Sequence, residues 1–479
     1  MKETILITAL ATILAAPVFA GASISQADNS ALATQNEQAA AIEEARYKRR
    51  AMEAGTWFMP QIMYYSMEQG AFETFGGDEL TIYYYSKPMN WQARMVTGNN
   101  NSPYVHTYHD LSKTGPVVVE IPAATETNAF FGTFLDSWHK PIVDVGPGGE
   151  DRGLGGKYLV VPAGYEGDTE GYIVVEQETN KGYISIRSLT DSTSDEDMAK
   201  HVDYVQSMKM YPLGAQDTTT QFIDLWGKTY EATIPFDLRF WTAADYMVQN
   251  EVIKQDEKAF YGMMKSLGIE KGKRFNPSEK QVDMLIEAAK ELHQEMMHDV
   301  AYFAPKLWPE TSNWTIPVPM EMMTTNATYV SENWNDYQSR GATFYFYFAP
   351  PASLAESKST TYIKGALDSD GVKLNGGSDY QIVIPADVPA KRFWSMLTYA
   401  TKDGAYIENA DPIGIASNES QVVINSDGTT TLTWSSHCEG KVNCMPVIEG
   451  EEFFTLFRLY GPEAAFFDKS FALPDIVKR

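Results

Sequence analysis

The sequence has 479 residues, of which 44% are hydrophobic and 13% aromatic, so the chain can bury a large core and is long enough for two or three domains. Its 38 basic and 63 acidic residues give a formal net charge of -25. A surface with this charge repels nucleic acid and anionic membranes, so nucleic acid is excluded as an expected partner.

The first 22 residues have the pattern of a secretory signal peptide. Lys2 precedes an apolar run at 5–16, and "VFA" at 18–20 is a small-x-small cleavage pattern. The run is too short to cross ~30 Å of hydrocarbon, and no later segment reaches the roughly 18 uninterrupted apolar residues of a transmembrane helix. We therefore expect a periplasmic or secreted protein with no membrane span. A buried N-terminal helix is the alternative.

A leader and a helix are expected next. Residues 21–35 are small and polar, which predicts a disordered leader. Apolar residues at a 3–4 spacing then predict a helix from Asn36 that ends near Gly55, and a second helical pattern follows Pro60.

Short β-rich runs, separated by Gly, Pro and Asp, occupy 79–187 and return at 343–458. Several strands at this spacing predict antiparallel sandwiches or barrels. The fold class that we predict is mainly β with helical segments: two β-sandwich domains connected by a helical region. The predicted parts are 1–22 signal peptide, 23–56 leader and N-terminal helix, 57–190 first β domain, 191–320 helical region and 321–479 second β domain.

The clearest helix of the central region is predicted to begin at Asn276. Asn276 suits the cap, Pro277 the first turn, and Glu279 completes a pattern like a capping box. The buried stripe is expected to contain Leu285, Ala289, Leu292 and Met296. The histidines of this helix, His293 and His298, are five residues apart and point in different directions, so they do not form the zinc motif H-E-x-x-H. No metal site and no cofactor is predicted.

The stretch "RMVTGNNNSPYVHTYHD" (94–110) places three asparagines directly before a predicted core strand. Asparagine tolerates tight turns and can bond its own backbone, so a purely structural turn is one interpretation. The other is that the turn delivers amides and phenols to a polar ligand, which they would orient by hydrogen bonds. The candidate ligand-binding residues of this stretch are Asn99, Asn101, Ser102 and Tyr104.

Four side chains near predicted strand ends are the candidate catalytic acids and bases: Asp110, Asp136, His106 and His139. Carboxyl and imidazole groups are common general acids and bases. His106 and His109 are three residues apart on a presumed strand and should point to opposite faces. One of the two is expected to lie close to His139 or Asp136, because "LDSWHK" (135–140) is expected to end a neighbouring strand. A histidine that is simply satisfied within the fold is the alternative.

The two cysteines, Cys438 and Cys444, lie six residues apart in "SSHCEGKVNCMP". In an exported protein this spacing indicates a local disulfide. A zinc site is less well supported, because two thiolates and His437 fall short of the usual four zinc ligands.

The chain resembles two families of proteins of unknown function. "TGNNNSPY" (97–104), "DLSKTGPVVVEIP" and "GGKYLVVPAGY" (155–165) resemble the domain-of-unknown-function family numbered 1254. "LDSDGVKLNGGSDYQIVIP" (367–385), "INSDGTTTLTW" (424–434) and "FRLYGP" (457–462) resemble the partner family numbered 1214. The resemblance implies two β-sandwich, jelly-roll-like domains flanking helices, often in an exported protein. It brings no activity.

The chain departs from the pattern of these families at several positions. Asn101 stands where the first family usually has Asp, and Ser102 replaces Thr but keeps a hydroxyl. Cys444 stands where the second family usually has Trp. The missing carboxylate at Asn101 makes ligand binding easier to accept there than proton transfer.

Two functions are compatible with these observations. The first is an exported hydrolase acting on a small polar or carbohydrate-like substrate. The second is a non-catalytic protein that binds a ligand or glycan, in which Trp138, Trp394 and Tyr399 would stack on the partner. Ordinary packing in the sandwich core is the alternative for these aromatic residues, and it is favoured for Trp394. The expected partners are a small polar ligand or a glycan, and a homo-oligomer is compatible with the sequence.

Overall fold

The computed structural model describes residues 26–190, 192–352 and 360–479. The described residues fall into two units, which divide between Tyr47 and Lys48. The predicted signal peptide lies outside the described residues. Helix and strand take nearly equal shares, 28% and 27%, so the fold is mixed α and β rather than mainly β as predicted.

The long helix α1 (Gln26–Phe75) accounts for much of this difference. It begins before the predicted start at Asn36, and it continues through both Gly55 and Pro60. Gly55 does not end the helix. A side-chain carbon there would lie 2.3 Å from Leu292 Cδ1, so this glycine allows close packing against another helix.

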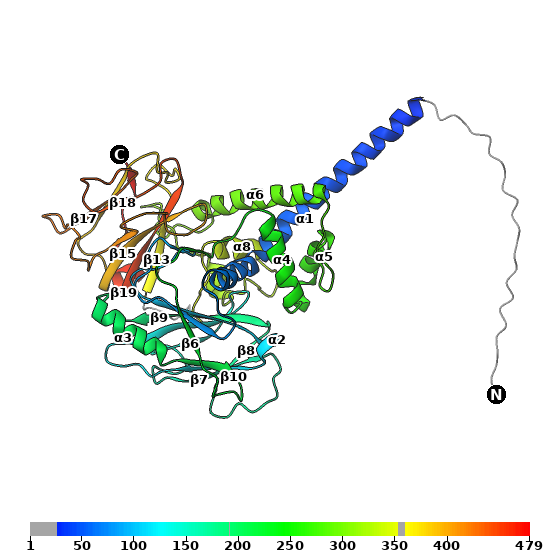
Figure 1. The fold of residues 1–479 in the computed structure, drawn as a ribbon. Helices are drawn as coiled ribbons and strands as arrows, with labels where there is room; N and C mark the ends of the chain where they lie inside the picture. The colour runs from blue at the N-terminus through cyan, green and yellow to red at the C-terminus, as the bar shows by residue number, and fades with distance from the viewer. Residues whose placement is uncertain (1–25, 191, 353–359) are drawn as a thin grey trace, which may run out of the picture. The chain divides into compact units, whose positions relative to one another are not determined.

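The first β region contains two main sheets (Figure 1). The six-stranded sheet has the order β11-β1-β3-β9-β5-β6, and the four-stranded sheet has the order β10-β4-β7-β8. A short pair joins β12 to β2. The strands are β1 (Thr81–Tyr84), β2 (Ala93–Arg94), β3 (Tyr104–Asp110), β4 (Val117–Ile121), β5 (Ala129–Asp136), β6 (Pro141–Val145), β7 (Gly156–Pro162), β8 (Ile173–Gln177), β9 (Lys181–Leu189), β10 (Lys209–Pro212), β11 (Gln221–Asp224) and β12 (Tyr230–Glu231). Strands β10, β11 and β12 lie beyond residue 190 yet pair with β4, β1 and β2.

The alternation of side chains along β3 gives the six-stranded sheet two different faces. Val105 points into a hydrophobic core that the sheet shares with the four-stranded sheet, together with Ile184 of β9 and Val119 of β4. The opposite face carries Tyr104, His106 and Tyr108. Tyr108 on this second face packs against Tyr64 and Phe72 of α1. This second face is therefore the polar one, and it contains the candidate residues of β3.

Most of the remaining helices lie in the central region, and one of them, α6, was predicted closely. Besides α1, the helices are α2 (Leu111–Thr114), between β3 and β4, α3 (Asp195–Gln206), α4 (Leu238–Asn250), η1 (Gln255–Glu257), α5 (Lys258–Ser266), α6 (Glu279–Tyr302), α7 (Met320–Thr324), α8 (Tyr337–Phe344) and, near the C-terminus, α9 (Ala464–Phe467). The cap of α6 is Ser278, with a capping box to Gln281, and not Asn276 as predicted. The predicted stripe is confirmed, since its four residues are all buried. Among the described residues, no helix combines the length and apolar character that a membrane crossing requires.

The second β region contains two four-stranded sheets, with the orders β13-β19-β15-β16 and β18-β17-β14-β20. The strands are β13 (Thr360–Gly365), β14 (Tyr380–Ile384), β15 (Ala390–Ala400), β16 (Gly414–Ala416), β17 (Thr430–Ser435), β18 (Cys444–Pro446), β19 (Phe453–Pro462) and β20 (Val477–Lys478). Figure 1 shows most of this region in yellow to red. Trp434 of β17 stacks on Phe453 and donates a hydrogen bond to Thr398 of β15, which links the two sheets.

The predicted disulfide is confirmed: Cys438 and Cys444 are bonded, with their Cα atoms 5.5 Å apart. No closed barrel is found within the described ranges, and the strand orders do not identify either region as a jelly roll. The jelly-roll-like topology implied by the family resemblance therefore stays a prediction, as do the domain boundaries.

Candidate functional site

Two pairs of tyrosine and arginine, one from each β region, meet at a single place. Tyr104 lies beside Arg187 in the pairing of β3 with β9, and Tyr362 lies beside Arg458 in the pairing of β13 with β19. Directly opposed residues on paired strands share one face of the sheet. Arg187 Nη1 lies 3.4 Å from the hydroxyl oxygen of Tyr362 and donates a hydrogen bond to it. The two pairs, with Tyr399 and Tyr460, are called the arginine–tyrosine cluster.

Arg458 is the most buried charge of the cluster. Its side chain is fully inside the protein, with 2% of the residue exposed. Nη2 donates to the hydroxyl of Tyr399 at 2.8 Å and to the carbonyl oxygens of Thr97 and Gly98, both at 3.3 Å. Nε and Nη1 have no hydrogen-bond partner among the described residues. Burying a charge with unsatisfied N–H groups costs free energy. An acceptor bound to these two donors would reduce that cost.

Among the described residues, the cluster lacks the carboxylate counterion that a buried arginine normally has. Elsewhere in the fold, Arg340 pairs with Glu257 at 3.1 Å and Arg94 pairs with Asp403. Within residues 26–190, 192–352 and 360–479, neither Arg187 nor Arg458 pairs with a carboxylate. In a chain with a net charge of -25, two neighbouring guanidinium groups without an acid are unusual. Guanidinium forks fit carboxylate and phosphate groups, so the cluster has the chemistry of an anion site.

The asparagine run reaches this cluster. The side-chain oxygen of Asn99 accepts a hydrogen bond from the backbone N–H of Asn101 at 3.0 Å, which shapes the turn. The Asn99 amide also donates to the hydroxyl of Tyr460 at 3.1 Å, and that hydroxyl lies 3.4 Å from the side-chain oxygen of Asn101. The turn therefore has a backbone role and also brings two amides to the cluster. Ser102 is buried in the same turn.

The phenols of the cluster differ in their electrostatic environment. Burial raises the pKa of Tyr362, but Arg187 and Arg458 lower it by more, so its pKa falls below the ordinary value for tyrosine. For Tyr104, burial outweighs the lowering by the same two arginines, and its pKa rises. The cluster thus contains one phenol that gives up its proton more easily than usual and one that holds its proton more tightly.

His106 borders the cluster from β3. Its ring stacks on Tyr104, with the centroids 5.8 Å apart, and burial lowers its pKa to about 4. The imidazole is therefore neutral at pH 7. Both ring nitrogens lack a hydrogen-bond partner among the described residues. His109 lies on the opposite face, as predicted, and contacts Gln177 of β8 at 2.9 Å.

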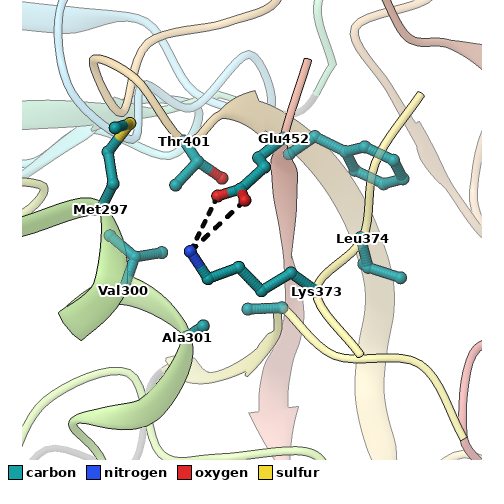
Figure 2. A pocket seen from close by; sticks show the side chains of 9 residues that line it. Met297, Val300, Ala301, Lys373, Leu374, Thr401 and Glu452 are labelled. Carbon is teal, nitrogen blue, oxygen red and sulfur yellow. Dashed lines mark hydrogen bonds and ion pairs between the residues drawn. The ribbon is translucent and has the colours of Figure 1, made fainter. Parts of the chain in front are cut away.

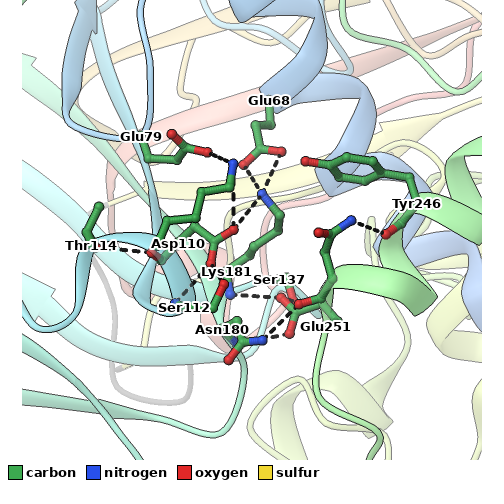
Figure 3. A network of polar contacts seen from close by, with 12 residues as sticks. Glu68, Glu79, Asp110, Ser112, Thr114, Ser137, Asn180, Lys181, Tyr246 and Glu251 are labelled. Carbon is green, nitrogen blue, oxygen red and sulfur yellow. Dashed lines mark hydrogen bonds and ion pairs between the residues drawn. The ribbon is translucent and has the colours of Figure 1, made fainter. Parts of the chain in front are cut away.

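Asp110 lies at the other end of β3, six residues from Tyr104, or about 20 Å at the usual rise along a strand. It belongs to a buried network that Figure 3 shows. Lys181 Nζ lies 3.0 Å from Glu68 Oε1 and 3.3 Å from Asp110 Oδ2, and all three side chains are at most 1% exposed. Asp110 also caps the short helix α2 through Ser112 N–H. These contacts hold Asp110 in the fold, far from the cluster.

The remaining predicted site residues also have structural contacts. Asp136 accepts hydrogen bonds from the backbone N–H groups of Trp138 and Lys140, at 2.8 and 2.9 Å. His139 has partners at both ring nitrogens, the hydroxyl of Tyr183 at 2.7 Å and the carbonyl of Pro60 at 2.9 Å. Trp138 is only 4% exposed, so its ring has no free face for a glycan. The structure does not bring His106, Asp110, Asp136 and His139 together around one point.

A surface hollow lies elsewhere, beside α6 (Figure 2). An adjoining cavity of about 400 Å³ is lined by Gln294, Met297, Lys373, Lys402, Glu451 and Glu452. Its charges neutralise one another, because Lys373 pairs with Glu452 at 3.1 Å and Lys402 with Glu451 at 2.7 Å. This cavity therefore offers a ligand fewer unpaired charged groups than the arginine–tyrosine cluster does. In the part of the chain that is described, no group of three His, Cys, Asp or Glu residues could hold a metal ion.

The sequence prediction reached Asn99, Asn101 and Tyr104 but missed both arginines of the cluster and Tyr362. The missed residues lie within strand runs that were recognised. A usable signal was present, because Arg458 interrupts the apolar run "FFTLFRLY" and Arg187 interrupts "YISIRSL". An arginine inside a buried strand needs a partner, and in the part of the chain that is described no acid supplies one.

Comparison with protein families gives two matches. Residues 79–212 match the family model described as Protein of unknown function (DUF1254), and residues 359–464 match Protein of unknown function (DUF1214). The two matches hold Arg187 and Arg458 respectively, so each contributes one arginine to the cluster. No curated protein matches the chain.

Two solved structures are similar. The VPA0106 protein of Vibrio parahaemolyticus has 17% sequence identity and a TM-score of 0.51, over 90% of this chain and 100% of that chain. An uncharacterised protein from Burkholderia cenocepacia has 11% identity and a TM-score of 0.40, over 91% of this chain and 95% of the other. The first likeness supports the fold alone.

Proposed function

Since the chain belongs to the DUF1254 family by its first β region and to the DUF1214 family by its second, we propose that its function lies where these regions meet. The arginine–tyrosine cluster binds a small polar ligand that carries an anionic group. The guanidinium groups of Arg187 and Arg458 receive the anion, and the amides of Asn99 and Asn101 bind neighbouring hydroxyl groups.

One observation carries this proposal: two neighbouring arginines, one of them 2% exposed, have no acid partner among the described residues, while other buried arginines do. A ligand anion would satisfy the free Nε and Nη1 donors of Arg458. Arg187, Tyr104 and Tyr362 are only partly buried, so part of each side chain reaches solvent. The partly exposed rings of Tyr104 and Tyr362 suit a carbohydrate-like ring.

Hydrolysis of a small polar or carbohydrate-like substrate is the second candidate. His106 supports it, because this neutral imidazole has two free nitrogens beside the cluster. A hydrolase would also need an acid, and Asp110 and Asp136 are engaged in other contacts. Binding therefore fits the geometry better.

We propose further that the protein works outside the cytoplasm, in the periplasm or as a secreted protein. The signal-peptide pattern at 1–22 supports this location. The disulfide between Cys438 and Cys444 supports it as well, because disulfides persist in oxidising compartments.

The proposed function predicts a preference for glucuronate over glucose, two sugars that differ in a carboxylate. Isothermal titration calorimetry at low salt should show glucuronate binding at least tenfold more tightly, which corresponds to about 1.4 kcal/mol. Added salt should weaken the binding, because the attraction is between charges. Equal affinities for the two sugars would contradict the proposal.

Asn101→Asp should weaken binding of glucuronate about tenfold, because the new carboxylate competes for the arginines and repels the ligand anion. The melting temperature should change little, since aspartate also suits such turns. The exposed Asn418→Asp variant is the control, with the same added charge. If both variants bind like the wild type, Asn101 has only a backbone role.

A further inference from the structure

We infer that the arginine–tyrosine cluster is catalytic as well as binding: it removes the proton next to the carboxylate of a bound uronate and expels the oxygen substituent on the adjacent carbon. This β-elimination rests on the proposed function, because the substrate is held by its carboxylate. The bond to the oxygen substituent is broken by elimination and not by attack of water.

The position of Tyr362 carries the inference. Its hydroxyl oxygen accepts a hydrogen bond from Arg187 at 3.4 Å, and the guanidinium carbon of Arg458 lies 5.2 Å from the centre of its ring. A carboxylate bound by the same two arginines is therefore held next to this phenol. In the proposed complex, the carbon that carries the carboxylate lies next to the Tyr362 oxygen.

The arginines have a second role in this reaction. When a proton leaves the carbon beside a carboxylate, negative charge spreads onto the carboxylate oxygens. The two guanidinium groups stabilise that charge as it develops, and Arg458 is already held by Tyr399 and by the turn at Thr97 and Gly98. Donors that are in place before the reaction need no reorganisation, which makes them effective.

The Tyr362 oxygen, as phenolate, takes the proton from the carbon that bears the carboxylate. The electron pair of the broken C–H bond forms a carbon–carbon double bond, and the bond from the next carbon to its oxygen substituent breaks. The leaving oxygen takes a proton from the Tyr104 hydroxyl. The products are an unsaturated sugar acid and an alcohol, and exchange with water returns the proton from Tyr362 to Tyr104.

The two phenols are suited to these opposite roles. The pKa of Tyr362 lies below its ordinary value, because the lowering by Arg187 and Arg458 outweighs the effect of burial. The pKa of Tyr104 is raised by burial, so this phenol keeps its proton until the leaving oxygen needs it. The stacked His106 ring fixes one face of Tyr104.

The test measures proton removal directly. The full mature protein is incubated with glucuronate in deuterated water, and mass spectrometry follows deuterium entering the carbon next to the carboxylate. The wild type should catalyse this exchange. Tyr362→Phe should slow it by about 100-fold or more, the usual contribution of a general base. Its affinity for glucuronate should stay within about tenfold, the effect of one hydrogen bond.

The exposed Tyr302→Phe variant is the control for loss of a phenol hydroxyl and should exchange at the wild-type rate. Binding of glucuronate without exchange by the wild type would overturn the elimination and leave the proposed function standing. Equal exchange by Tyr362→Phe would also overturn it. Absence of glucuronate binding would contradict both proposals.

Discussion

Replacing Lys181 by Met is expected to lower the free energy of unfolding by about 3 to 5 kcal/mol, the usual effect of removing one partner from a buried ion pair. Lys181 lies between Glu68 and Asp110, and its side chain is 0% exposed. Without the ammonium group, two buried carboxylates would face each other, with only the half-exposed Lys113, 4.0 Å from Asp110, as a neighbouring cation among the described residues. Urea unfolding at neutral pH measures the loss.

Lys113→Met is the matched control. Lys113 pairs with Glu79 and lies 4.0 Å from Asp110 at the edge of the same network, but its side chain is 51% exposed. An exposed pair contributes little, so this variant should lose less than about 1 kcal/mol. If Lys181→Met does not fold, a triple variant with Glu68→Gln and Asp110→Asn added should recover folding. The three substitutions remove all three charges of the buried ion pairs between Lys181, Glu68 and Asp110. Equal small losses for Lys181→Met and Lys113→Met would contradict the account of the network.

Arg187→Met is expected to reduce affinity for glucuronate about 30-fold, or about 2 kcal/mol, because one of two charged anchors is lost. The free energy of unfolding should change by less than about 1 kcal/mol. Arg187 makes one long hydrogen bond within the protein and has no counterion among the described residues, so an apolar side chain of similar length replaces it at little cost. This separation of binding from stability is the signature of a residue that serves a ligand.

Arg239→Met provides the comparison for that variant. Arg239 is 73% exposed and pairs with Asp237 at the start of α4. Calorimetry should show wild-type affinity for glucuronate. A loss of stability without a loss of affinity in Arg187→Met would mean that Arg187 has only a structural role.

The part of the site that could be predicted is the part that depends on local sequence. Three asparagines before a strand indicate a turn, and alternation along β3 places His106 and His109 on opposite faces. The buried stripe of α6 follows in the same way from a 3–4 spacing. These features depend on neighbours in the chain, and the structure agrees with them.

The other half of the cluster depends on packing between distant segments. Arg187 and Tyr362 are 175 residues apart, and nothing in either strand indicates that they meet. The same limit affected the catalytic candidates, because Asp110 was chosen for its residue type while its buried partners, Glu68 and Lys181, come from α1 and β9. The course of α1 through Gly55 was missed for a related reason, since the neighbour that requires a glycine there is Leu292.

The central claim is that Arg187 and Arg458 form a site for an anion. The most direct measurement is X-ray diffraction at the bromine absorption edge from crystals soaked in bromide, which locates bound anions without assuming a ligand. The account predicts an anomalous peak in contact with the guanidinium groups of both Arg187 and Arg458. Bromide at exposed arginines such as Arg239, with none at the cluster, would contradict it.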